Sequence, residues 1–266
     1  GEANGRRGYA YARRFIQSCT GQLFSEVAAA AADVPGVLVH SHVAEHAEER
    51  AAVKAQLGRD DVAALSAWGV RGEHTVLAHG VQLRAAEMRR MARDGTRVAH
   101  CPSANLKLAS GIADVVAMRD AGMVVGIGPD GAPCNNRMDP WTELRSAALL
   151  AKAKRLDAAA LPAERAFELA TIEGARVLGL QAEIGSLEVG KSADFVVVER
   201  DGLHQLPGGD PYSRLVYATR ASDVRHVVID GQVVVKDGQL LTLDEERVRR
   251  AAVREAKRLL SRTKLR

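Results

Sequence analysis

Apolar and polar positions along the chain alternate in blocks that predict short strands separated by helices. Four runs rich in Val, Ile, Leu and Ala have the length of buried strands: residues 36–42, 74–79, 97–100 and 123–128. Between them lie helix candidates, including residues 83–94 and 112–121. Strands that alternate with helices in this way are typical of βα units around a parallel sheet, so the pattern predicts an α/β fold.

The pattern changes in the second half of the chain. Residues 141–155 and 163–178 have helical spacing, and Pro162 marks a helix start. Residues 184–198 and 224–235 then have the composition of turns and strands, and Asp230-Gly231 predicts the turn of a hairpin. From residue 244 onward we expect an amphipathic helix with one apolar side formed by Val248, Ala252, Ala256 and Leu260. The predicted units are a parallel-sheet segment (1–180), a small β-sandwich-like domain (181–242) and a basic C-terminal helix (243–266).

Charge and composition narrow the classes of partner. The chain has 266 residues, a net charge of +4 and only 4% aromatic residues. Residues 247–266 hold nine Lys and Arg against one acid, so the basic character belongs to the tail and the remainder is acidic overall. Little aromatic material is available for stacking bases, and we expect no nucleic-acid partner.

Neither a membrane segment nor a disulfide framework is expected. The sequence contains no run of 18 or more apolar residues, and the first seven residues contain no apolar signal core. Three widely spaced cysteines, Cys19, Cys101 and Cys134, fit a reducing compartment. These features predict a cytoplasmic protein.

Residues capable of chemistry close the predicted strands. On the first strand His40 and His42 face the same way, and Glu45 follows the strand end. His79 closes the second strand, and Asp130 follows the fourth between glycines. Each residue alone has an ordinary structural interpretation, as a solvated strand end, a packed histidine or a turn aspartate. Histidines and an aspartate at the ends of separate strands, with a glutamate nearby, are together typical of a hydrolytic metal site.

Six motifs are spread over nearly the whole chain: residues 40–45, 77–79, 100–111, 130–136, 170–175 and 184–194. In these motifs and in their order the sequence resembles the amidohydrolase superfamily, within it the branch of cytosine and guanine deaminases, methylthioadenosine/S-adenosylhomocysteine deaminases and triazine hydrolases. The resemblance implies that residues 1–180 are the C-terminal part of a (β/α)8 barrel of the TIM type. It also implies a small-molecule heterocyclic substrate that loses ammonia, and a homo-oligomer.

The resemblance also implies roles for individual residues. One divalent metal ion, zinc or alternatively iron, would be bound by His42 and Asp130, with His79 beside the metal-bound water and the substrate. Asp130 would accept the proton of the water and Glu45 would protonate the ring of the substrate. Arg14 and Phe15 match a Pro-Arg-Phe motif that contacts substrate, although here Arg13 replaces the proline.

Further matched positions are assigned to packing. Asn105 and Lys107 are expected to pack within their loop, and His100 is expected to pack or to support a ligand. Pro129 stands where the family has Thr or Ser, which would stiffen the approach to Asp130.

The first strand of the family carries a His-x-His metal pair, and no histidine precedes His40 here. His40-Ser41-His42 could be that pair, but the following Val-Ala-Glu matches the fifth strand better. Only about half of the eight strands are found, so we interpret the sequence as incomplete rather than as that of a degenerate or split protein. These 266 residues alone are expected to bind zinc weakly and to show no turnover, because two ligands cannot close such a site.

The sequence has features of one other enzyme class and leaves two further functions open. The cytidine-deaminase signature is suggested by His46-Ala47-Glu48 and Pro133-Cys134, but Arg137 occupies the position of its second cysteine. Hydrolysis with another leaving group, such as triazine dechlorination or opening of a cyclic amide, stays open. A non-catalytic subunit also stays open, and the upstream coding sequence would discriminate it from an enzyme.

Overall fold

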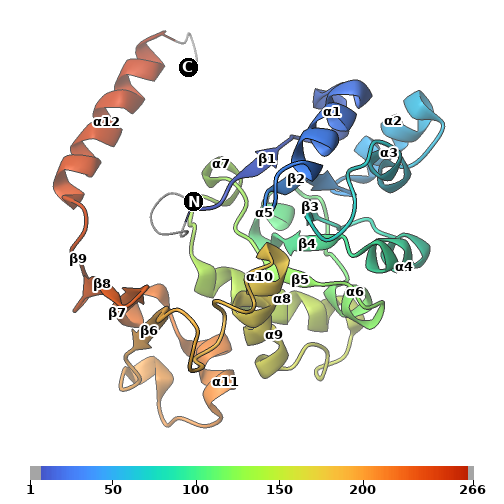
Figure 1. The fold of residues 1–266 in the computed structure, drawn as a ribbon. Helices are drawn as coiled ribbons and strands as arrows, with labels where there is room; N and C mark the ends of the chain where they lie inside the picture. The colour runs from blue at the N-terminus through green and yellow to red at the C-terminus, as the bar shows by residue number, and fades with distance from the viewer. Residues whose placement is uncertain (1–6, 263–266) are drawn as a thin grey trace.

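The computed structural model describes residues 7–262, which form a parallel sheet with helices and a separate antiparallel sheet (Figure 1). The parallel sheet has the order β1-β2-β3-β4-β5, and neighbouring strands are hydrogen-bonded in parallel register. Its strands are β1 (Ala10–Ala12), β2 (Leu38–Val43), β3 (Thr75–His79), β4 (Arg97–His100) and β5 (Val125–Ile127). The expected α/β fold is confirmed, and β1 is a strand that the sequence pattern did not reveal.

Helices connect consecutive strands, as parallel pairing requires. The connecting elements are η1 (Ile16–Ser18), α1 (Gly21–Ala32), α2 (Ala47–Leu57), α3 (Asp61–Ala67), α4 (Ala85–Asp94), α5 (Pro102–Lys107) and α6 (Val115–Asp120). After β5 come α7 (Ala132–Asn135), α8 (Pro140–Arg155), α9 (Ala163–Ala170) and α10 (Ile172–Leu178).

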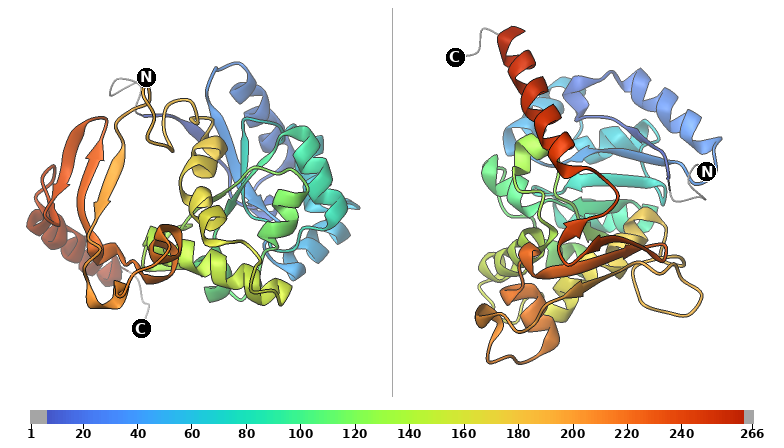
Figure 2. Two further views of the ribbon diagram at one scale, coloured as in Figure 1. Left: turned by 90° about the horizontal axis from the view of Figure 1, so that it is seen from below. Right: turned by 90° about the vertical axis from the view of Figure 1, so that its left-hand side faces the viewer.

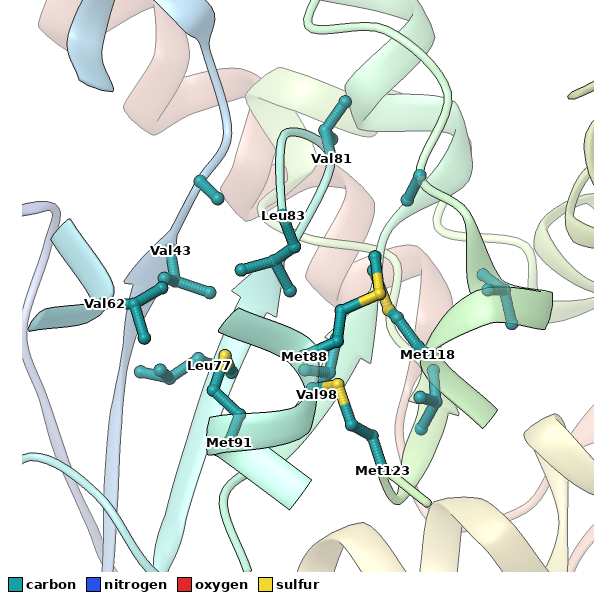
Figure 3. Close-up of a cluster of buried hydrophobic side chains, with 14 of the residues drawn as sticks. Val43, Val62, Leu77, Val81, Leu83, Met88, Met91, Val98, Met118 and Met123 are labelled. Atoms are coloured by element: carbon teal, nitrogen blue, oxygen red, sulfur yellow. The ribbon is translucent and has the colours of Figure 1, made fainter. Parts of the chain in front are cut away.

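The main hydrophobic core lies between the sheet and the connecting helices. On β2 the buried positions are Val39, Ser41 and Val43, while His40 and His42 point to the other face because side chains alternate along a strand. Apolar side chains from β2, β3 and β4 meet the methionines of α4 and α6 in this core, including Met88 and Met118 (Figure 3). The sheet therefore has one face packed against helices, and it presents the two histidines on the opposite face.

The predicted helix over residues 163–178 is wrong in one respect, because the chain forms two helices that break at Thr171. The backbone of Thr171 has φ −124° and ψ −101°, which is not helical. Both α9 and α10 contact β5. At Gly126 of β5 an added Cβ would lie 3.0 Å from the Cα of Gly174, so the close approach of α10 to the strand requires a glycine there. The amphipathic pattern continues through the break, which is why the sequence did not show it.

The chain continues after α10 into the antiparallel sheet β6-β7-β8-β9. In the described residues the predicted β-sandwich-like domain contains this one sheet, and residues 184–194 are turns rather than strand. Asp230 and Gly231 both have positive φ and close the predicted hairpin. The elements are β6 (Phe195–Val198), η2 (Leu203–Gln205), α11 (Pro211–Ser213), the π-helical turn η3 (Arg214–Ala218), η4 (Ala221–Asp223), β7 (Val224–Ile229), β8 (Gln232–Lys236) and β9 (Gln239–Leu240).

The C-terminal helix α12 (Glu245–Arg262) follows β9 and extends away from the rest of the molecule (Figure 2). It buries no residue in the described chain, and its apolar residues, such as Val248 and Leu260, are exposed. The last four residues of the predicted basic helix, 263–266, and residues 1–6 of the predicted barrel segment lie outside the described residues. No helix within residues 7–262 is long and apolar enough to cross a membrane.

Candidate active site

Three side chains from separate strand ends converge at the carboxyl edge of the parallel sheet. His42 lies near the end of β2, His79 closes β3, and Asp130 follows β5 by three residues. Each offers one potential ligand atom, and these atoms all lie within 4.8 Å of one another. This edge is where (β/α) barrels build their sites. The expected convergence of the three residues is confirmed.

The backbone at these strand ends is held in an uncommon conformation. His79, Asp130 and Ala44, the residue before Glu45, have φ of 76°, 62° and 51°. Few non-glycine residues adopt this left-handed region, and such residues persist where surrounding contacts fix them. The turn at each strand end thus places a functional side chain on the rim of the sheet.

Burial lowers the pKa of two histidines on β2, His40 and His42, so both are neutral near pH 7. Burial, helped by the nearby imidazoles of His79 and His40, lowers the pKa of His42 to about 4. Burial also lowers the pKa of His40, whose Nδ1 donates to the carbonyl of Val76 at 3.0 Å. The rings of His42 and His79 stack with centroids 5.2 Å apart. A neutral imidazole keeps a lone pair for a metal ion, so this environment favours metal binding over protonation.

Asn105 fixes the tautomer of His79. Its side-chain Oδ1 lies 2.8 Å from Nδ1 of His79, and an amide oxygen can only accept, so Nδ1 carries the hydrogen. In the neutral ring the lone pair is then on Nε2, on the side away from Asn105. The sequence assigned Asn105 to loop packing, and nothing in its motif indicated this contact across 26 positions.

Glu45 lies on the same rim, with Oε2 3.5 Å from Nε2 of His79. Its Oε1 accepts a long hydrogen bond of 3.4 Å from the hydroxyl of Ser110. A second carboxyl group, Glu49, was not expected near the site. Burial, then the charges of Glu45 and Asp61, raises the pKa of Glu49 to about 7.

The other expected residues are divided between the site and its surroundings. The ring of Phe15 lies edge-on to His42 with centroids 6.4 Å apart. Arg14 is exposed, and its guanidinium lies over the ring of Phe15 at 5.6 Å. Lys107 donates to the carbonyl of Pro133 at 2.7 Å, which is a packing contact within the rim. His100 is 2% exposed, and burial lowers its pKa to about 4.

The donor set fits a zinc ion. Two imidazoles and one carboxylate are nitrogen and oxygen ligands of the type that catalytic zinc sites use. Nδ1 of His42 is buried and has no hydrogen-bond partner within residues 7–262. Burying a polar atom without a partner is costly, and a bound cation would satisfy it.

The reactivity of the Cys101 thiol tests whether this part of the site is closed to solvent. The thiol is 2% exposed, and burial raises its pKa to about 12, whereas Cys19 and Cys134 are partly exposed. The thiolate is the reactive form, so we expect Cys101 to resist alkylation in the native full-length protein at about pH 8. Peptide mass mapping after brief iodoacetamide treatment should find label on Cys19 or Cys134 before Cys101. Prompt labelling of Cys101, absent in Cys101→Ser, would contradict the buried position.

The sequence model of the amidohydrolase family matches residues 1–234 of this chain. A 5-methylthioadenosine/S-adenosylhomocysteine deaminase of Moorella thermoacetica is 43% identical over 231 residues, which are 87% of this chain and 54% of that protein. The chain thus spans about half the length of this curated relative.

Solved structures agree with the fold. An adenosine deaminase of Xanthomonas campestris with bound zinc has a TM-score of 0.91 at 36% identity, over 95% of this chain and 57% of that one. An atrazine chlorohydrolase of Arthrobacter aurescens, complexed with zinc, has a TM-score of 0.85 at 27% identity, over 92% of this chain and 53% of that one.

Proposed function

Since the chain belongs to the amidohydrolase family, we propose that the full-length protein removes an amino group from a nitrogen heterocycle by metal-dependent hydrolysis and releases ammonia. The observation that carries this proposal is the convergence of His42, His79 and Asp130 within 4.8 Å, with Glu45 on the same rim. Two imidazoles, a carboxylate and a second carboxylate placed for proton transfer are the groups that this reaction needs.

The proposed mechanism divides metal binding, proton transfer and substrate contact among the residues of the site. His42 and Asp130 would hold a zinc ion, and zinc would supply a water whose pKa is lowered to about 7. Asp130 accepts the proton of the attacking water. Glu45 delivers a proton to the ring nitrogen, which makes the amino-bearing carbon more electrophilic. His79, held by Asn105, directs Nε2 toward the reacting atoms, and Phe15 and Arg14 line the substrate side.

The proposed substrate is an amino-substituted purine, with an adenosine thioether favoured over a pyrimidine or a triazine. Support comes from the 43% identity to the 5-methylthioadenosine/S-adenosylhomocysteine deaminase, against 27% to the atrazine chlorohydrolase. A single zinc ion, a cytoplasmic location and a homo-oligomer are part of the proposal. Light scattering of the purified protein would measure the oligomeric state.

The test is an ammonia-release assay on the zinc-loaded full-length protein. 5′-Methylthioadenosine, S-adenosylhomocysteine, adenosine, guanine and cytosine are compared as substrates, with chloride release from atrazine as the competing reaction. We expect ammonia from a purine substrate, its loss on chelation and its return with zinc. Absence of ammonia from every substrate, or chloride release alone, would overturn the proposal.

The 266 residues expressed alone should bind zinc weakly and release no ammonia. The resemblance assigns two further ligands to a His-x-His pair, and the first histidine of this chain is His40. With at most His42, Asp130 and His79 available, the metal is left open to solvent and chelators. Zinc titration against a chelating indicator, beside the ammonia assay, checks the expectation, and turnover that is lost on chelation would refute it.

A further inference from the structure

A buried ion cluster contacts the backbone of Ala44, the residue immediately before Glu45. It consists of Arg50 on α2, Asp61 at the start of α3 and Glu87 on α4, which are 8%, 6% and 8% exposed. The guanidinium of Arg50 contacts both oxygens of Glu87, and its Nε lies 3.2 Å from Oδ1 of Asp61. The two helices that follow β2 and the helix that follows β3 are thus joined by one cation.

The cluster ends on the backbone that carries Glu45. Oδ2 of Asp61 accepts a hydrogen bond of 2.6 Å from the amide of Ala44. The carbonyl of Ala44 accepts from the amide of Gln82 at 2.8 Å, and the carbonyl of Gln82 accepts from Arg50. Both polar groups of Ala44 are therefore held by the cluster or its partners. Ala44 is the residue with φ 51°, so these bonds fix an uncommon conformation immediately before Glu45.

A second branch reaches the Glu45 side chain. The side-chain Nε2 of Gln82 donates to the backbone carbonyl of Ser110 at 2.8 Å. The hydroxyl of Ser110 lies 3.4 Å from Oε1 of Glu45 and 3.0 Å from Nε2 of His46. Gln82 thus connects the backbone before Glu45 with the group that contacts the Glu45 carboxylate.

The contacts of the cluster with Ala44 do not fit two simpler explanations, a cation site and an ion pair that only stabilises the fold. Asp60, Asp61 and Glu87 offer oxygens close enough together to hold a cation, but the positive charge is already supplied by Arg50. An ion pair that only stabilised the fold would not need to bind Ala44, which has a left-handed backbone and immediately precedes Glu45. Such residues cluster at functional sites when the surrounding structure fixes them.

We propose that Arg50, Asp61 and Glu87 are positioning residues that hold the Ala44 turn, and through it aim the Glu45 carboxylate at the substrate. This inference rests on the proposed role of Glu45 in proton transfer. Small displacements of a catalytic group reduce the rate strongly, while substrate binding elsewhere in the site is unaffected. Loss of the cluster should therefore act on kcat and leave KM and zinc content unchanged.

The experiment is a double-mutant cycle in the full-length, zinc-loaded protein. Asp61→Ala should lower kcat by about 10- to 100-fold, with KM changed less than about twofold and zinc content unchanged. In the Glu45→Gln background the same substitution should have almost no further effect, because the group that it misplaces is already inactive. Arg50→Lys keeps a charge but loses the two-pronged contact, and it should show a smaller loss of kcat with the same coupling.

The matched control is Arg119→Met, which breaks a partly exposed ion pair with Glu168 between α6 and α9, far from Ala44 in the chain. It should leave kcat unchanged. Equal losses from Asp61→Ala in the wild-type and Glu45→Gln backgrounds would overturn the positioning role. If Asp61→Ala does not fold, the same comparison with Arg50→Lys decides. If Glu45→Gln itself keeps full turnover, the role of Glu45 fails and the positioning role fails with it. The proposed function fails only if the wild type releases no ammonia, so the two failures are distinguishable.

Discussion

Glu45→Gln in the full-length protein is expected to keep its zinc and to lose about 10²- to 10⁴-fold of its turnover. Glu45 touches His79 and Ser110 from the rim and is not among the three clustered potential ligands, so its loss removes a proton donor without opening the metal site. Asp130→Asn should behave differently. Asp130 is asked both to bind the metal and to accept the proton of the water, and an amide does both poorly.

Metal analysis of each purified variant beside ammonia release separates the two roles. Glu45→Gln should have the zinc content of the wild type, whereas Asp130→Asn should lose both zinc and turnover. Glu48→Gln, an exposed change three residues along the chain, is the control and should leave both unchanged. A metal-free Glu45→Gln protein would show that the assigned roles are wrong.

The parts of the site that the sequence predicted are those that depend on local pattern. His42, His79 and Asp130 each close or follow an apolar run, and parallel strands bring their carboxyl ends to one edge, so their convergence could be inferred without knowing any distance. The Asp230-Gly231 turn was predictable for the same reason, since its backbone conformation is encoded in two adjacent residues.

The parts that the sequence missed depend on contacts between distant segments. Asn105 meets His79 across 26 positions, and Arg50 meets Glu87 across 37. The type of a residue shows which hydrogen bonds its side chain can form, but it does not show which distant residue is the partner. The short strand β1 is three residues long and paired on one side, so its pattern is too brief to recognise.

Glu143 is a buried charge whose contacts join two sides of the site. It is 0% exposed, on α8. Its Oε2 accepts from the amide of Ser103 at 3.0 Å, at the start of the short helix that carries Asn105. Its Oε1 accepts from Nδ2 of Asn135 at 2.8 Å, and that same nitrogen donates to the carbonyl of Pro129 at 2.9 Å. Glu143 therefore supports both the residue that orients His79 and the turn that carries Asp130.

Glu143→Ala should consequently destabilise the full-length protein and weaken its zinc binding together. Removing the carboxylate takes one partner from the part-buried amide of Ser103 and one from the buried side chain of Asn135. Hydrogen bonds to a charged group contribute about 1.5–3 kcal/mol each, so we expect a loss of about 3–6 kcal/mol in the free energy of unfolding. Mutation of residues that hydrogen-bond to metal ligands typically lowers metal affinity by about 10- to 100-fold, and a decrease in that range should accompany the loss of stability.

Urea unfolding and competitive zinc titration measure the two effects. Glu143→Gln keeps one acceptor and should lie between the wild type and Glu143→Ala, while Glu164→Ala, at an exposed position of α9, should change neither. Unchanged zinc affinity in a destabilised Glu143→Ala protein would show that Glu143 supports the fold alone and not the site.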